Sequence, residues 1–128
     1  MKRMVVAVVL LSATSAWAEW TSIGRGEKWE IYVDLTALHQ KGNLVKMWSL
    51  WDYPAARLGP KRRKYLSAKE LDEYDCDERQ SRLLYFSYHF GNMGADPILY
   101  ENNEPDTGWT PVAPDSWAEV LWKTACNQ

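Results

Sequence analysis

Two cysteines and two histidines are the side chains in this chain that are best suited to redox or metal chemistry. Cys76 and Cys126 form an even pair, which in an exported chain indicates a disulfide. Only one pairing is available within the chain. It closes a loop of about 50 residues, which the chain-entropy model values at roughly 4 kcal/mol. The alternatives are two free thiols or a bridge between two chains.

The remaining residues indicate neither a metal site nor a catalytic nucleophile. His39 and His89 fall in different expected elements, with no spacing that suggests a shared metal. If both cysteines are in a disulfide, thiolate zinc ligands and a cysteine nucleophile are excluded. The sequence contains no phosphate-binding glycine loop and no serine in a nucleophile-elbow pattern. We therefore expect no metal, no cofactor and no enzymatic activity.

Carboxylates gather around the first cysteine. The cluster consists of Asp72, Glu73, Asp75, Asp77 and Glu78. It lacks the loop pattern of a calcium-binding helix-loop-helix motif, so we interpret it as a solvated acidic edge. Two carboxylates are nevertheless sufficient for general acid–base catalysis. A small enzyme that uses carboxylates near Cys76 is therefore an alternative.

Four successive cations, Lys61, Arg62, Arg63 and Lys64, follow a stretch with two prolines and a glycine at 54–60. Like charges this close repel one another and favour water, so the run is expected to be a solvated loop or a strand edge. A loop beside it would present the side chains outward. The run is also the best candidate for contact with an anionic partner.

The N-terminus has the features of a secretory signal peptide. Lys2 and Arg3 precede a short apolar run at 4–11, and a small-x-small motif ends at Ala18. We predict cleavage between Ala18 and Glu19; the alternative is an uncleaved anchor. The apolar run is too short to span a bilayer, and no cysteine follows the cleavage point to accept a lipid. We therefore expect a periplasmic, secreted or envelope protein with no membrane span after cleavage.

Cleavage leaves 19–128 as one domain of common size. The signal peptide contains two basic residues and no acid, so 13 basic residues face 17 acidic residues in the remaining 110. This balance argues against a nucleic-acid partner, because such a protein would need a basic footprint. Seven of the eight tryptophans lie in this part of the chain, where they supply apolar area to a small core.

Alternation of apolar and polar residues predicts a sheet. Trp29 to Asp34 is typical of a half-buried strand, and Arg79 to Phe90 is the clearest one. The expected strands are 20–23, 29–34, 44–53, 65–74, 79–90 and 97–100. Between them we expect a helical turn at 34–38, a chain reversal at 41–43 and a hairpin turn at 91–94. The segments 54–60 and 102–108 are expected to be loops.

A helix is expected from Ser116 to Cys126. Ser116 and Glu119 match a capping box, and the expected apolar stripe is Trp117, Val120, Leu121 and Thr124. Its last turn would carry the Cys126 thiol to a strand that ends near Cys76. The predicted fold is α+β: an antiparallel sheet of about six strands with a C-terminal helix tied to it by the disulfide.

Several short features together resemble a known family. In chain order they are Tyr32-Val33-Asp34, Gly42-Asn43, Trp48 with Asp52-Tyr53, Tyr65 with Ser67, Glu73-Tyr74-Asp75-Cys76, Trp109 with Val112 and Pro114, and Ser116 with Cys126. Through them the chain resembles the surface-adhesin protein E family of exported bacterial domains. The resemblance covers essentially the whole chain after the signal peptide.

The resemblance implies the disulfide-tied sheet and helix, an envelope location and, from the family's namesake, adhesion to host matrix proteins and a homodimer. The surface-anchored member has a lipid-attachment cysteine, whereas none stands at the cleavage point here. The expected function is thus a non-catalytic envelope module that binds a host or envelope protein or a polyanion. The alternatives are the small periplasmic enzyme and an assembly subunit that pairs through a sheet edge.

Overall fold

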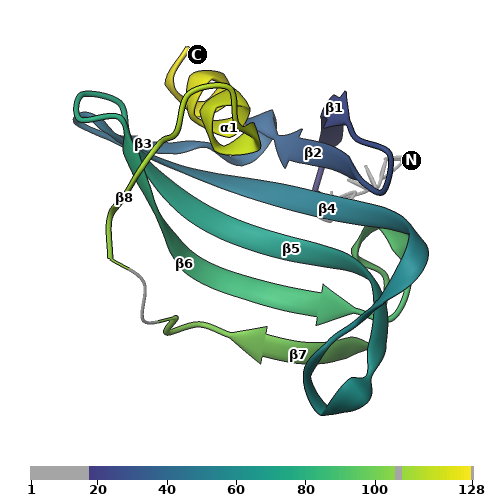
Figure 1. Ribbon diagram of the computed structural model, residues 1–128. Helices are drawn as coiled ribbons and strands as arrows, with labels where there is room; N and C mark the ends of the chain where they lie inside the picture. Colours follow the sequence, from purple (N-terminus) through teal and green to yellow (C-terminus); the bar gives the residue numbers. More distant parts are fainter. Residues whose placement is uncertain (1–17, 106–107, 128) are drawn as a thin grey trace, which may run out of the picture.

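The structure is a computed structural model that describes residues 18–105 and 108–127 (Figure 1). The expected signal peptide lies outside the described residues except for Ala18, which with Glu19 is exposed ahead of the first strand. The elements are β1 (Trp20–Arg25), β2 (Glu30–Asp34), η1 (Leu35–Ala37), β3 (His39–Lys41), β4 (Leu44–Leu58), η2 (Pro60–Arg62), β5 (Lys64–Asp75), β6 (Gln80–His89), η3 (Asn92–Gly94), β7 (Ile98–Asn102), β8 (Thr110–Pro111) and α1 (Trp117–Cys126), where η marks a 3₁₀ turn.

The strands form one twisted antiparallel sheet. Six of them follow the order β1-β2-β4-β5-β6-β7, and two short strands are added: β3 pairs with β4, and β8 pairs with β6. Figure 1 shows α1 across one end of this sheet, near β3, while β6 and β7 extend beyond it. This confirms the predicted α+β class and the C-terminal helix. The sheet has two short strands beyond the six that were expected.

The hairpin of β1 and β2 forms one side of the core. Ile31 and Val33 are fully buried, as the alternation in this segment predicts. β1 continues past its expected end at residue 23, through a bulge between Ser22 and Gly24. A Cβ at Gly24 would overlap the ring of Trp117, so the glycine allows the helix to approach the hairpin closely.

Strand β4 is longer than the sequence predicts. The segment 54–60 was expected to be a loop, but β4 continues to Leu58 and pairs with β5 up to Lys64. The register shifts between Asp52 and Arg57, so Pro54 lies in a bulge where its missing N–H does not break a ladder hydrogen bond. The loop prediction was therefore wrong for 54–58, because pairing with β5 overrides the local proline signal.

Helix α1 begins where the capping pattern predicts. The Ser116 hydroxyl accepts a hydrogen bond from the Glu119 N–H at 3.2 Å, which satisfies a free donor of the first turn. At the other end, Cys126 is bonded to Cys76, with 5.5 Å between their Cα atoms. The predicted disulfide is present in the structure, and it fixes the last turn of the helix to the end of β5.

The face that the helix turns to the sheet differs from the predicted stripe. Leu121 and Ala125 are its buried residues, and Trp117 packs against the same core. Val120 is 36 % exposed, so its place in the stripe was wrong. The contact follows the i, i+4, i+8 line through Trp117, Leu121 and Ala125, which lie on one face of the helix.

Trp117→Ala should lower the free energy of unfolding by about 2–3 kcal/mol. A fully buried tryptophan would be worth roughly 3–5 kcal/mol, and this ring is only partly buried. It meets the Trp29 ring edge-on, with 6.5 Å between centroids. Urea denaturation measures the change, and Val120→Ala on the exposed side should cost less than about 0.5 kcal/mol. Equal midpoints for the two variants would contradict this assignment of the helix face.

Candidate binding surfaces

The four-cation run lies at the tip of the β4–β5 hairpin. All four side chains are exposed, with Lys61 and Arg62 in the turn η2. The tip is closed by two backbone hydrogen bonds, from the Gly59 N–H to the Arg63 carbonyl at 2.8 Å and from the Arg63 N–H to the Pro60 carbonyl at 3.2 Å. Figure 1 shows the ribbon of β4 and β5 bending away from the sheet to reach this turn. The cations are therefore presented to solvent.

The charge of this tip is not balanced by neighbouring acids in the sequence. Residues 53–69 contain six basic side chains and no acid, although the whole chain has a formal charge of −2. The ion pairs found among the described residues lie elsewhere: Arg25–Glu30, Arg79–Glu119, Arg82–Glu73 and Lys123–Glu119. A local positive region on an acidic protein attracts anions over a distance set by the ionic strength.

The acidic cluster around Cys76 is divided among different environments. Glu73 is buried on the side of β5 away from α1, where Arg82 donates to it at 2.6 Å and 2.9 Å. Asp75 accepts from the backbone N–H groups of Glu78 and Asp77, each at 3.1 Å, and these bonds lower the pKa of Asp75. Asp77 and Glu78 are exposed. The five acids therefore do not form one site.

Asp72 is paired with Glu70, which precedes it by two residues on β5. Both side chains lie on the helix side of the sheet, in line with the buried Tyr74, because strand residues two apart share a face. Burial raises the pKa of Glu70, and burial together with the nearby Glu70 carboxylate raises the pKa of Asp72 to about 8. The two carboxyl groups therefore share a proton at neutral pH.

A connected set of five aromatic rings begins beside this carboxyl pair. Opposite Glu70 on β6 is Phe86, and Tyr88 stacks on Tyr65 with 4.2 Å between centroids. The set, termed the aromatic array, consists of Tyr53, Tyr65, Phe86, Tyr88 and Tyr100. Burial raises the pKa of Tyr53 to about 12, so its hydroxyl stays protonated at neutral pH. The array gives the half of the sheet beyond α1 an aromatic surface.

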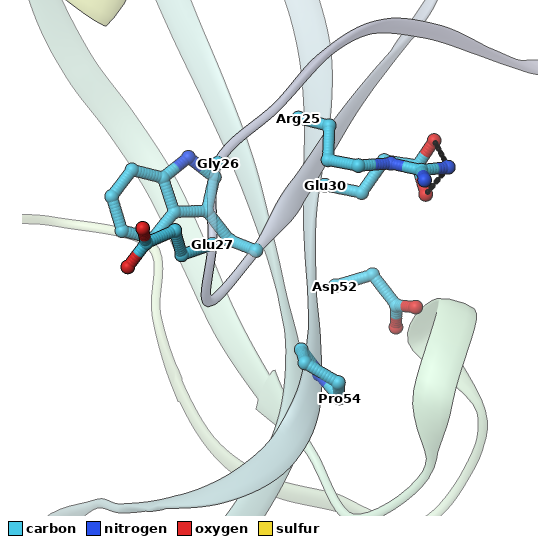
Figure 2. A pocket seen from close by; sticks show the side chains of 7 residues that line it. Arg25, Gly26, Glu27, Glu30, Asp52 and Pro54 are labelled. Atoms are coloured by element: carbon cyan, nitrogen blue, oxygen red, sulfur yellow. Dashed lines mark hydrogen bonds and ion pairs between the residues drawn. The ribbon is translucent and has the colours of Figure 1, made fainter.

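A shallow hollow of about 270 Å³ lies between the β1–β2 turn and β4. Figure 2 shows the Arg25 and Glu30 side chains paired, at 3.4 Å, with Asp52 and Pro54 from the neighbouring strand below them. Asp52 is itself engaged, since it accepts from the Met93 N–H at 2.8 Å. Charges of both signs line this hollow, so it does not select a ligand by charge.

The two histidines lie apart, as the sequence predicts. His39 is exposed on β3, whereas His89 is buried with its Nε2 2.7 Å from the Ser87 hydroxyl. Burial lowers the pKa of His89, and the nearby Lys69 adds to this effect. Within residues 18–105 and 108–127, no group of three histidine, cysteine or acidic side chains is placed to hold a metal ion.

Two features of these surfaces were missed from the sequence. The first is the Glu70–Asp72 pair, whose spacing of two in an expected strand already predicts a shared face. The second is the association of Phe86, Tyr88 and Tyr100, which requires knowing that β6 and β7 are neighbours in register. The exposed cationic run at 61–64 was anticipated correctly.

The described residues form a disulfide-tied antiparallel sheet with a C-terminal helix, exposed cations at one hairpin tip and shallow hollows. The chain belongs to the surface-adhesin protein E family, whose model matches residues 20–127. It is therefore an adhesin-like surface protein. No functionally curated protein matches it in sequence. None of its described helices is long and apolar enough to cross a membrane.

Solved structures of Haemophilus influenzae protein E have the same fold. Crystal form II matches with a TM-score of 0.64 at 11 % identity, over 76 % of this chain and 80 % of that chain. The structure from non-typeable Haemophilus influenzae matches with a TM-score of 0.62 at 10 % identity, over 89 % of this chain and 76 % of that chain. At this identity the likeness extends to the fold alone.

Proposed function

We propose that the protein is an exported, non-catalytic module of the bacterial envelope that binds a protein or polyanionic partner through the tip at Lys61, Arg62, Arg63 and Lys64. In this proposal the signal peptide is cleaved between Ala18 and Glu19, and no lipid is attached there. Family membership supports the adhesin-like role, and the signal-peptide pattern supports export.

The observation that carries the proposal is the exposed, unbalanced charge of the β4–β5 tip. Four adjacent cations repel one another, so the stability of the fold does not explain their placement. They stand on a hairpin that bends out of the sheet, where a partner reaches them without rearrangement of the core. A contact of this kind is mainly electrostatic and weakens as salt rises.

The two alternatives have weaker support. An enzyme would use carboxylates of the acidic cluster near Cys76, where Asp72 pairs with Glu70. None of these carboxylates lines any of four hollows in the described part of the chain. An assembly subunit or homodimer would pair through β1 or β7, since each of these strands ends the sheet order with one unpaired side. The contact by the cationic tip is compatible with such pairing.

Changing all four tip cations to Gln should reduce retention on heparin resin by at least about tenfold at low salt. The protein is purified after expression of the full-length chain and eluted with a salt gradient. Unchanged secondary structure by circular dichroism shows that the variant is folded. Equal retention of the wild type and the variant would exclude the tip as the anionic contact.

A matched control separates the tip from net charge. Arg25, Lys28, Lys41 and Lys123 are also exposed, and changing these four to Gln alters the formal charge by the same amount. The proposal expects this second variant to keep most of the retention. If both variants lose retention equally, the attraction belongs to the overall charge of the protein and not to the tip.

A further inference from the structure

Exposed apolar side chains are concentrated at one end of the molecule. Six large apolar side chains are exposed among the described residues. Five of these are on the β4–β5 hairpin, the β6–β7 connection or β7: Leu58, Phe90, Met93, Ile98 and Tyr100. The sixth, Val120, is on α1. Scattered exposed apolar residues are ordinary, but a concentration of them indicates an interaction surface.

The cationic tip, Phe90 and Ile98 belong to the same end of the sheet. His89, the last residue of β6, pairs with Ser67 near the start of β5 and with Ile98 at the start of β7. Phe90 therefore leaves the sheet beside the base of the hairpin that ends at Leu58 and Lys64. Figure 1 shows the hairpin and the start of β7 together at the lower right.

Within the hairpin itself, apolar and cationic side chains are adjacent. Leu58 is 63 % exposed and lies directly opposite Lys64, so the two side chains share a face. Pro54, Ala55 and Ala56 before them are exposed as well. The whole segment combines apolar side chains with cations and contains no carboxylate between residues 53 and 69.

We propose that this end of the protein docks on an anionic lipid bilayer. Leu58 and Phe90 enter the headgroup region, and the cations at 61–64 contact lipid phosphates. The proposal deepens the proposed function by identifying the polyanionic partner as a membrane surface, and it rests on the cationic contact of that function. We term this surface the apolar-cationic end; it consists of Lys61, Arg62, Arg63 and Lys64 with Leu58 and Phe90.

A bilayer fits this surface better than a soluble polyanion or a folded protein does. A polysaccharide provides anionic groups but no apolar phase for Leu58 and Phe90, which are 63 % and 59 % exposed. A folded protein partner would have to be concave to bury a projecting hairpin, whereas lipids rearrange around it. Interfacial binding combines buried apolar area with attraction of cations to anionic headgroups, and this end of the sheet supplies both.

The test is cosedimentation of the purified protein with anionic vesicles made of phosphatidylglycerol and phosphatidylcholine in equal parts. Vesicles of pure phosphatidylcholine are the control without net charge. Binding is expected to the anionic vesicles only. Leu58→Gln should weaken it by about tenfold, because the apolar transfer of one leucine is lost. The variant with all four tip cations changed to Gln should weaken it by at least about a hundredfold.

Matched measurements make the result specific. Val120→Gln removes an exposed apolar side chain from α1, away from this end, and should leave vesicle binding unchanged. Leu58→Gln should also leave heparin retention unchanged, because all the charges remain. If Leu58→Gln weakens vesicle binding but leaves heparin retention unchanged, the leucine side chain contributes by apolar insertion into the bilayer.

Three outcomes would overturn the inference. Retention on heparin without binding to anionic vesicles would exclude the bilayer and leave the proposed function intact, with a soluble polyanion as the partner. Vesicle binding that is insensitive to both Leu58→Gln and Phe90→Gln would show a purely electrostatic contact, which is not the docking proposed here. If the wild-type protein is neither retained on heparin nor bound to anionic vesicles, the cationic contact of the proposed function is excluded together with the bilayer docking.

Discussion

Replacing both cysteines by serine, Cys76→Ser with Cys126→Ser, should lower the free energy of unfolding by about 4 kcal/mol. The bond links residues 50 apart in sequence, and its loss restores the conformational freedom of that loop to the unfolded chain. It also releases the last turn of α1, which otherwise keeps Leu121 and Ala125 on the sheet. Urea denaturation of the purified variant measures the change through its midpoint.

Reductant provides the internal control for this experiment. Wild-type protein treated with a thiol reductant should unfold at the midpoint of the double-serine variant, and the variant should not respond to the reductant. Identical midpoints for untreated wild type and variant would show that the covalent link contributes nothing to stability. The contacts that hold the helix would then be its packing on the core and polar ties such as the Trp122 indole N–H, which donates to the Asp75 carbonyl at 2.8 Å.

Asp72→Asn should raise the free energy of unfolding by about 2–4 kcal/mol at pH 8 and change it little near pH 4. Burial and the Glu70 carboxylate raise the pKa of Asp72 from 3.8 to about 8 in the folded protein. Between about pH 4 and about pH 8 the folded state therefore binds more protons than the unfolded state. Stability falls as pH rises through this window, and the amide removes the part of that dependence that comes from Asp72.

The measurement is the difference in unfolding free energy between wild type and Asp72→Asn across that pH range. His89 contributes a slope of opposite sign, because its pKa is lowered on folding and its stabilisation is lost as pH falls through about 6.5. It is present in both proteins and cancels in the difference. A difference that does not grow with pH would show that the two carboxyl groups do not share a proton.

Glu73→Gln is the matched control for this pair. Glu73 is the next residue on β5, but it lies on the opposite face and is paired with Arg82 at 2.6 Å. Loss of this ion pair should lower stability at neutral pH, which is the opposite direction to Asp72→Asn. The two neighbouring acids thus differ in the sign of their effect, because one has a cation as its partner and the other has an acid.

The sequence by itself determined the features that depend on near neighbours along the chain. Ser116 and Glu119 define the start of α1, because a cap is completed within three residues. Alternation places Ile31 and Val33 in the core, because strand geometry alone sets which residues share a face. The single possible cysteine pairing and the exposure of the cations at 61–64 follow from composition and charge in the same way.

The tertiary structure decided the features that depend on which strands are neighbours. β4 continues past Pro54 because β5 supplies a partner beyond the bulge, and no local signal contains that partner. The pKa of Asp72 rises because the strand is buried, with α1 and the rings of β6 on the same face. Leu58, Phe90 and Ile98 are far apart in sequence, and they lie toward the same end of the sheet because β4, β5, β6 and β7 pair in that order. Side-chain placement across a sheet is set by register between strands, and register is a property of the assembled sheet and not of any one strand.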